Sequence, residues 1–207
     1  MSAWTQIAVP ARLPDAVYRA EQRALSIGRV YRIYRQDGGL AAYVKHPVMT
    51  LLERFTIFAD EGQTQPLIGV KQRKLLQVNR CFDLFDPAGG LVATLQRRAM
   101  RSILRDRWDL IDASSQPTGS VDEVGFALAR RFIKFLPHHW RIHLGGDMVA
   151  ALDQRFTLVR KRVEIDLTPN RGRIDPNVAF AAAILLMHEV HSAASDIASD
   201  AAPAVDL

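Results

Sequence analysis

The chain has 207 residues, 48% of them hydrophobic, and one cysteine, Cys81. A chain of this length and composition is expected to bury a sizeable core in one domain, or at most two, and a single cysteine excludes an internal disulfide and a metal site built from several cysteines. Lys and Arg number 27 against 22 Asp and Glu, and the formal net charge of +5 favours acidic partners such as phospholipid headgroups or nucleic acid.

Residues 1–22 are interpreted as an N-terminal arm, because they contain Pro10 and Pro14 and show no hydrophobic period. The same stretch has neither the basic start nor the continuous apolar run of a secretory signal peptide. We therefore expect a cytoplasmic protein, with any membrane contact peripheral and on the inner face.

Turn signals divide the next part of the chain into short segments that are typical of β-hairpins. Each signal combines an aspartate, which favours a tight turn, with glycine, which tolerates positive φ. The signals lie at residues 37–39, 60–62, 86–90 and 112–119. Many of the segments alternate apolar and polar residues, as strands with one buried face do. The predicted strands are Arg29–Arg35, Leu51–Ala59, Leu67–Gln72, Arg80–Phe85, Leu91–Gln96, Arg107–Ile111, His139–Leu144, Met148–Leu152 and Thr157–Leu167.

A basic amphipathic helix is predicted at Phe126–Leu136, where apolar and basic residues fall on opposite halves of a helical wheel. Such a helix is typical of proteins that bind at a membrane interface, because its apolar face enters the headgroup boundary while its cations meet anionic lipid. The alternative is that the apolar half packs against the rest of the fold. The residues that would lie in the interface are Phe126, Arg130, Arg131, Phe132, Lys134 and Phe135.

A second helix is predicted at Val178–Met187, a stretch with no polar side chain. Asp175 suits the N-cap position and Pro176 the first position of this helix. A helix that is apolar on every side must be surrounded by protein or by lipid. The stretch is far shorter than the roughly 20 residues that cross a bilayer, so burial within the protein is the favoured interpretation and membrane insertion the alternative.

These elements predict a mainly β fold: a closed antiparallel barrel of about twelve strands that encloses the apolar C-terminal helix. The predicted barrel covers residues 23–194. Residues 195–207 are small, acidic and contain proline, and we expect them to form a flexible tail. The helix side chains expected to fill the interior are Phe180, Ile184, Leu185 and Met187.

Arginines and lysines on what we take to be neighbouring strands form a further basic feature. Guanidinium groups suit multidentate binding of phosphate, so these residues are a candidate site for a phosphate or lipid headgroup. The alternative is a solvated rim in which the cations form salt bridges with Asp106, Asp109 and Asp112. The candidate residues are Lys71, Arg73, Lys74, Arg97, Arg98, Arg101 and Arg105.

No motif in the sequence supports catalysis or metal binding. His188 and His191 are three residues apart, which is not the spacing of the zinc-binding H-E-x-x-H helix. His139 and His143 would share a strand face with Arg141 between them, and this cation disfavours a metal ion. The sequence also lacks a Gly-x-Ser-x-Gly elbow, a P-loop and a dinucleotide fingerprint. We therefore expect a protein without enzymatic activity, cofactor or bound metal.

Several stretches between residues 24 and 194 carry a resemblance to a known family. They are Tyr31–Tyr34 with Asp37–Gly39, Arg54–Glu61, Ile68–Arg73, Phe82–Asp86 with Gly89–Gly90, Gln96–Arg98 followed by Ser102–Trp108, and Val121–Glu123. Together with the apolar C-terminal helix, they resemble the tubby C-terminal-like superfamily, and within it the LURP-one-related proteins and the phospholipid scramblases. The resemblance implies a twelve-stranded barrel around a buried C-terminal helix.

The resemblance also implies a function in binding or handling phospholipid. Scramblases carry a cysteine-rich palmitoylation stretch and a more strongly hydrophobic C-terminal segment, and this sequence has neither. We therefore expect peripheral binding of anionic phospholipid headgroups, or a scramblase-like role in lipid handling. The alternative is a protein-interaction scaffold whose basic face binds an acidic protein partner. Nucleic acid is disfavoured because no recognised binding motif accompanies the charge.

Overall fold

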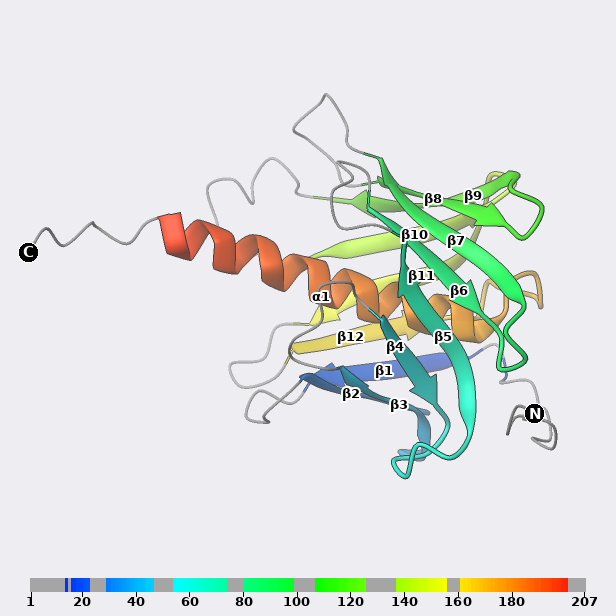
Figure 1. Ribbon diagram of the computed structural model, residues 1–207, viewed down its shortest axis with the longest axis horizontal. Coiled ribbons are helices and arrows are strands. Elements are labelled where there is room, and N and C mark those ends of the chain that lie inside the picture. The colour runs from blue at the N-terminus through cyan, green and yellow to red at the C-terminus, as the bar shows by residue number, and fades with distance from the viewer. Residues whose placement is uncertain are drawn as a thin grey trace, which may run out of the picture.

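The computed structural model describes residue 14 and residues 16–22, 29–46, 54–73, 80–98, 107–125, 137–155 and 161–200, and the side chains of its helix as far as His188. In this part of the chain twelve antiparallel strands form a closed barrel around one helix, which confirms the predicted fold class (Figure 1). The elements are β1 Val17–Gln22, β2 Arg29–Tyr34, β3 Leu40–His46, β4 Arg54–Phe58, β5 Pro66–Gln72, β6 Cys81–Phe85, β7 Leu91–Arg98, β8 Arg107–Asp112, β9 Pro117–Val124, β10 His139–Leu144, β11 Asp147–Arg155, β12 Lys161–Asp166 and α1 Pro176–Asp200.

Each strand neighbours the next one in the sequence, and β1 pairs with β12 to close the barrel. Because successive side chains of a strand point to opposite faces, every second residue faces the interior. On β6, for example, Phe82 and Leu84 are fully buried inside, whereas Asp83 lies outside and is partly exposed. The wall therefore has an apolar inner face and a largely charged outer face.

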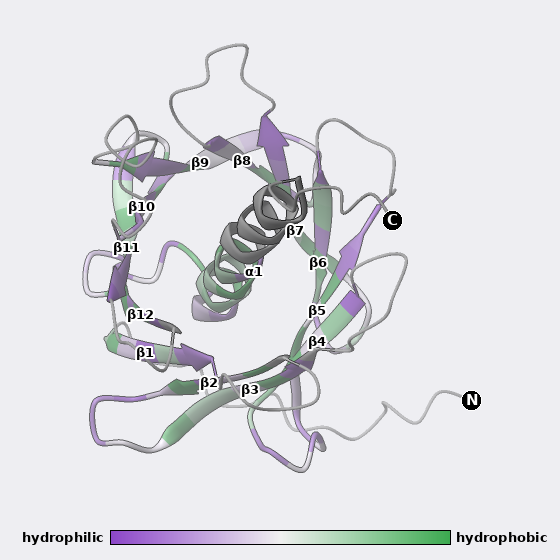
Figure 2. Ribbon diagram, turned by 90° about the vertical axis from the view of Figure 1, so that its left-hand side faces the viewer, coloured by the Kyte–Doolittle hydropathy of each residue, from purple (hydrophilic) through white to green (hydrophobic). Residues whose placement is uncertain are grey.

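The helix α1 runs along the barrel axis and fills the interior (Figure 2). It begins as predicted: the amide of Asn177 donates a hydrogen bond of 2.9 Å to Oδ1 of Asp175, so this aspartate caps the helix. The ring of Tyr18 packs edge-on against Phe180, with ring centroids 5.0 Å apart. All four helix side chains expected in the interior, Phe180, Ile184, Leu185 and Met187, are at most 3% exposed.

The two ends of the barrel differ. At one end, which we call the hairpin end, tight turns join the strands in pairs. In the turn between β6 and β7, Asp86 accepts a 2.8 Å hydrogen bond from the amide of Gly90, and Gly89 has a φ of +89°. At the opposite end, which we call the exit end, β7 ends, β8 begins and α1 leaves the barrel. The helix enters at the hairpin end, since it follows the end of β12 there.

The domain boundaries inferred from sequence differ from the structure at both ends. Residues 17–22, which we assigned to an N-terminal arm, form β1, which pairs with both β2 and β12 and buries Tyr18 and Ala20 against the core. Residues 195–200, which we assigned to a flexible tail, continue α1. The barrel cannot close without β1, so its first strand belongs to the domain.

Candidate functional site

Charge is distributed unequally along the barrel axis. The hairpin end carries aspartates because carboxylates accept hydrogen bonds from turn amides, as Asp112 does from the amide of Gln116 at 2.9 Å. The acidic residues of these turns are Asp37, Asp60, Glu61, Asp86, Asp112 and Asp147. At the exit end, cations at or next to the strand termini outnumber the acids Glu21 and Glu123, and these cations are Lys45, Arg54, Lys71, Arg80, Arg97, Arg98, Arg107 and Arg155. Which of these cations are available to an anion depends on the acids that they contact.

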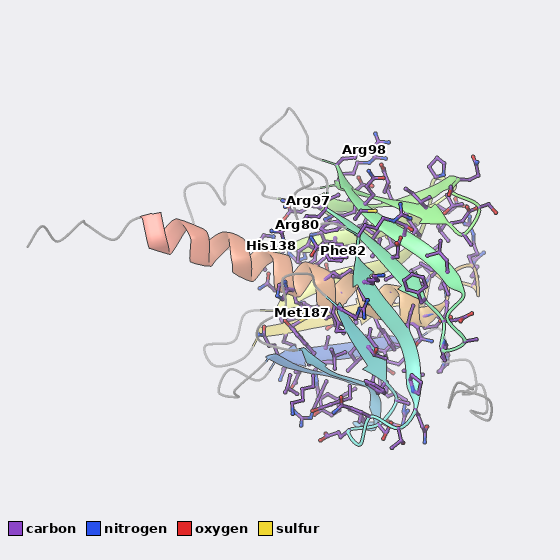
Figure 3. All side chains as sticks on the ribbon, viewed as in Figure 1. Arg80, Phe82, Arg97, Arg98, His138 and Met187 are labelled. Atoms are coloured by element: carbon purple, nitrogen blue, oxygen red, sulfur yellow. The ribbon has the colours of Figure 1, made fainter. Side chains whose placement is uncertain are left out.

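Two arginines that we grouped in one candidate site lie on opposite sides of the wall. Arg97 pairs with Trp108, which is 2% exposed, and therefore faces the barrel interior. Arg98, the next residue, faces outward and forms an ion pair through Nε with Asp109 (Figure 3). Strand alternation separates these neighbours, so they cannot share one phosphate group. Asp109 is one of the acids that the alternative interpretation, a salt-bridged rim, would use.

Arg80 accompanies Arg97 on the inner side. The amide of Arg97 donates a 2.8 Å hydrogen bond to the carbonyl of Arg80, which extends the register of β6 and β7 by one residue pair. Arg80 is two residues before the buried Phe82 and so faces the interior as well. Figure 3 places both arginines near the point at which α1 leaves the barrel.

Further inward-facing polar residues lie at this level on other strands of the same part of the wall. His138 Nδ1 lies 2.6 Å from Oε1 of Glu123, and the His138 ring stacks on Trp140 with centroids 5.3 Å apart. The side chain of Gln154 accepts a 3.2 Å hydrogen bond from the amide of His138. We call this group the exit rim; it comprises Gln72, Arg80, Arg97, Glu123, His138 and Gln154, which lie in or next to β5, β6, β7, β9, β10 and β11. The sequence analysis named Arg97 as a site residue but missed the other members, although each member continues the alternation of its strand by one step beyond the last apolar inward residue.

Arg73, another residue of the predicted phosphate site, is held by an acid on the outer wall. Its Nε donates to both carboxylate oxygens of Asp83, at 2.8 and 3.0 Å, and Asp83 also accepts a 2.7 Å hydrogen bond from Thr94. The hydrogen bond to Asp83 raises the pKa of Arg73. The charge of Arg73 is therefore largely compensated within the wall.

Most other cations of the outer wall are also compensated by acids. Arg32 binds both carboxylate oxygens of Glu61, with its Nε at 2.7 Å, and its guanidinium stacks over the ring of Tyr43. Further ion pairs of the wall are Arg107–Asp122, Arg141–Asp153, Arg155–Glu164, Arg162–Glu21 and Arg173–Asp147. Exposed pairs of this kind contribute little to stability, but they reduce the net charge that the wall presents to an external anion.

Three exposed cations near the exit end, Lys45, Arg54 and Lys71, form no ion pair with another described residue. They lie on the adjacent strands β3, β4 and β5, and we call them the cationic wall. Arg54 and Lys71 are directly opposite each other in the β4–β5 register, an arrangement of like charges that is destabilising. A bound anion would relieve this repulsion. The cationic wall is therefore the part of the described surface best suited to bind one.

The remaining predicted site residues lie outside the described part of the chain. They are Lys74, Arg101, Arg105 and the whole basic amphipathic segment 126–136, with Phe126, Arg130, Arg131, Phe132, Lys134 and Phe135. Their roles stay predictions. The strands that precede them in the sequence, β5, β7 and β9, all end at the exit end.

The histidines of β10 share a strand face with Arg141, as predicted; this is the outer face of the barrel, where they contact acids. His139 Nδ1 lies 2.7 Å from Oδ1 of Asp153, and Arg141 donates to the same oxygen at 2.7 Å. Burial raises the pKa of Asp153, but the hydrogen bonds from Arg141 and His139 outweigh it, so this pKa lies below its ordinary value. Within the described ranges no three His, Cys, Asp or Glu side chains are placed to share a metal ion.

Asp153→Asn is expected to destabilise the protein by about 1 kcal/mol at neutral pH, because a charged acceptor of two hydrogen bonds is lost. The pKa of an aspartate carboxyl group in the unfolded chain is about 3.9. When the pKa in the folded protein is lower, the carboxylate stabilises the fold fully at pH values above the unfolded-state pKa, and this stabilisation is lost as the pH falls through the folded-state pKa. The difference between the variant and the parent should therefore shrink below about pH 4. Urea denaturation across pH measures it, with Asp147→Asn as the exposed control; a difference that stays constant down to pH 2 would contradict the assignment.

Comparison with known proteins assigns no family to the chain: neither a scan against protein-family models nor a search of curated proteins found a match. Within the described residues, no helix combines the length and the apolar character needed to span a membrane. A barrel fold is compatible with many functions, so the function must be argued from the surface itself.

Proposed function

We propose that this protein is a non-enzymatic, tubby-like barrel that binds anionic phospholipid headgroups peripherally through its exit end. The observation that carries the proposal is the cationic wall: three exposed cations on neighbouring strands, without an acidic partner among the described residues, at the end of the barrel with the most basic strand termini. The sequence resemblance to LURP-one-related proteins and scramblases supports the same class of ligand, and extends the proposal to a scramblase-like handling of lipid at this surface.

Electrostatic attraction supports binding of this surface to an anionic membrane. Each Lys or Arg close to an anionic leaflet contributes about 1 kcal/mol at low ionic strength. The three cations of the cationic wall therefore contribute about 3 kcal/mol to a weak, reversible attachment, and they orient the barrel with its hairpin end away from the membrane. Because the Debye length is about 8 Å at physiological salt, only the cations that approach the surface closely contribute.

The barrel interior supports a role in binding rather than catalysis. Inward-facing side chains of the strands and of α1, such as Phe82, Leu152 and Phe180, are at most 1% exposed and fill the space that a substrate would occupy in a hollow barrel. This filled interior supports a site on the outer surface of the barrel, and we place it at the exit end because of the cationic wall.

The double variant Lys45→Gln/Lys71→Gln tests the proposal. Its affinity for phosphatidylcholine vesicles that contain phosphatidylserine should fall by about 25-fold at low salt, which is roughly fivefold for each lost charge. Co-sedimentation across a range of salt concentrations measures the affinity. The matched control is Arg35→Gln/Arg171→Gln, which removes the same charge from exposed positions near the hairpin end and should bind as the parent does.

Two outcomes would contradict the proposal. Equal losses in both double variants would show that net charge, and not the cationic wall, governs binding. No sedimentation of the parent with anionic vesicles would exclude the lipid function, and specific retention of an acidic protein by the parent but not by Lys45→Gln/Lys71→Gln would then favour the interaction scaffold.

A further inference from the structure

Three inward-facing side chains form a row across neighbouring strands at the exit end. Arg97 on β7 is in register with Trp108 on β8, and the amide of Arg97 donates a 2.8 Å hydrogen bond to the carbonyl of Arg80, the residue before β6. Neighbouring strands lie about 4.8 Å apart, so the backbone positions of the three residues span only about 10 Å of the wall. Arg80 and Arg97 are partly exposed, whereas Trp108 is buried. The row therefore runs from two arginines that meet solvent to one sheltered indole.

The indole of Trp108 holds a buried donor that lacks an acceptor. Its Nε1 is buried and forms no hydrogen bond with any residue that the structure describes. The acid of the exit rim, Glu123, contacts His138 instead, with Oε1 2.6 Å from Nδ1. Buried donors without an acceptor destabilise a fold and are rare in native proteins. We therefore expect an acceptor from outside the described chain to reach this position.

The polar groups of the row all donate hydrogen bonds, and two of them are cationic. A guanidinium has five N–H donors and no acceptor, so each arginine can hold one acceptor of the protein and still donate to a second. Arg80 and Arg97 are like charges on neighbouring strands, and an anion between them would relieve their repulsion. The apolar ring of Phe82 lies beside the row, with its centroid 5.8 Å from that of Trp108. Such surroundings strengthen charge-assisted hydrogen bonds, because the local dielectric constant is low.

We propose that Arg80, Arg97 and Trp108 form a binding site for a single phosphate group in the mouth of the barrel. A phosphate group fits the row better than a carboxylate does, because it offers at least three oxygens, one for each donor side chain, and guanidinium groups bind phosphate bidentately. Because Nε1 of Trp108 is buried, neighbouring side chains shift as the phosphate enters from the exit end. The phosphate is either the free ion or part of a lipid headgroup.

This inner site is separate from the cationic wall. The row faces the interior from β6, β7 and β8, whereas Lys45, Arg54 and Lys71 face outward from β3, β4 and β5. Figure 3 shows Arg80 and Arg97 near the point at which α1 leaves the barrel. Binding of phosphate to the row therefore does not require attachment of the outer wall to a membrane.

The variants Arg97→Gln and Arg98→Gln test the site as a matched pair, because these neighbours carry the same charge on opposite sides of the wall. Isothermal titration calorimetry of the full chain, at constant ionic strength, measures the affinity for two probes: inorganic phosphate, and dihexanoyl phosphatidic acid below its critical micelle concentration. We expect the parent and Arg98→Gln to bind at least one probe with affinities that agree within about twofold. Arg97→Gln should bind the same probe about tenfold more weakly or worse, because hydrogen bonds from a charged donor are lost. Arg80→Gln should behave as Arg97→Gln does.

The indole N–H of Trp108 provides a second readout. Its proton resonance in the NMR spectrum is the one that disappears in Trp108→Phe, and it should shift when the probe is added to the parent or to Arg98→Gln. In Arg97→Gln at the same probe concentration, the shift should be largely lost.

The two probes distinguish the sources of the phosphate group. Binding of inorganic phosphate that depends on Arg97 supports a site for the free ion, and binding of the short-chain lipid alone supports a site for a headgroup. Equal affinities of Arg97→Gln and Arg98→Gln, or no binding of either probe by the parent, would overturn the inference. Circular dichroism melting confirms that each variant is folded before it is compared. Attachment of vesicles through the cationic wall is tested by Lys45→Gln/Lys71→Gln, so that function can stand when the inner site fails.

Discussion

Leu185→Asp is expected to prevent the chain from folding. Leu185 is 1% exposed and lies on α1 inside the closed barrel, as a member of the hydrophobic core. Burial of an unpaired carboxylate in such a site costs several kcal/mol, a large share of the roughly 5 to 15 kcal/mol by which a domain of this kind is stable. We expect insoluble protein, or soluble protein without a cooperative thermal transition.

A matched control keeps this experiment specific. Met148 is the one large hydrophobic residue that is exposed among the described residues, at 42%, so Met148→Asp adds the same charge outside the barrel and should leave the melting temperature almost unchanged. Termination of the chain after Asp175 should be as damaging as Leu185→Asp, because the strands then enclose an empty apolar space. Cooperative melting of Leu185→Asp or of the truncated chain would show that α1 is not the core, and would revive the membrane-inserting alternative.

The buried helix could be predicted from sequence because its evidence is local. An uninterrupted apolar stretch that follows an N-cap aspartate and a proline is typical of a buried helix. The stretch is also too short to cross a bilayer. The strand β1 could not be recognised in the same way. Its sequence, Val17–Gln22, is short and mixed in character, and what makes it a strand is its pairing with β12, far away in the sequence. Tertiary contacts, not local propensity, decide such elements.

The candidate site was predictable only in part for a related reason. A cluster of basic residues is visible in the sequence, but the side of the wall on which each residue lies depends on the strand register. Arg97 and Arg98 show this, since one faces α1 and the other an acid on the outer wall. Whether Lys45 and Arg54 form an ion pair with a described residue depends in the same way on which acids lie on the neighbouring strands. Pairing between strands, which the sequence does not state, therefore determines which cations are available to a ligand.

Gly119→Ala is expected to destabilise the protein by more than most surface substitutions. We placed Gly119 in a turn from the sequence, but it lies in β9 and faces inward opposite Leu144 of β10. A Cβ atom at this position would overlap the backbone carbonyl oxygen of His143, and it would also lie 2.8 Å from Cδ2 of Leu144. A backbone atom cannot move aside as the end of a flexible side chain can, so β9 and β10 would have to separate.

We expect a cost at or above the upper end of the roughly 1 to 3 kcal/mol that overpacking usually causes, measured as a lower urea midpoint with an unchanged slope. Gly69→Ala is the matched control, since Gly69 also lies inside a strand, while the nearest atoms to its added Cβ belong to Phe85 and are 3.8 and 3.9 Å away. That substitution restricts the unfolded chain without a clash, and should change stability by less than about 1 kcal/mol. Equal midpoints for the two variants would mean that β9 and β10 are not as close at Gly119 as described. A large loss in Gly119→Ala alone would instead show that the hairpin end of the barrel depends on this one backbone contact, because no L side chain fits between the two strands there.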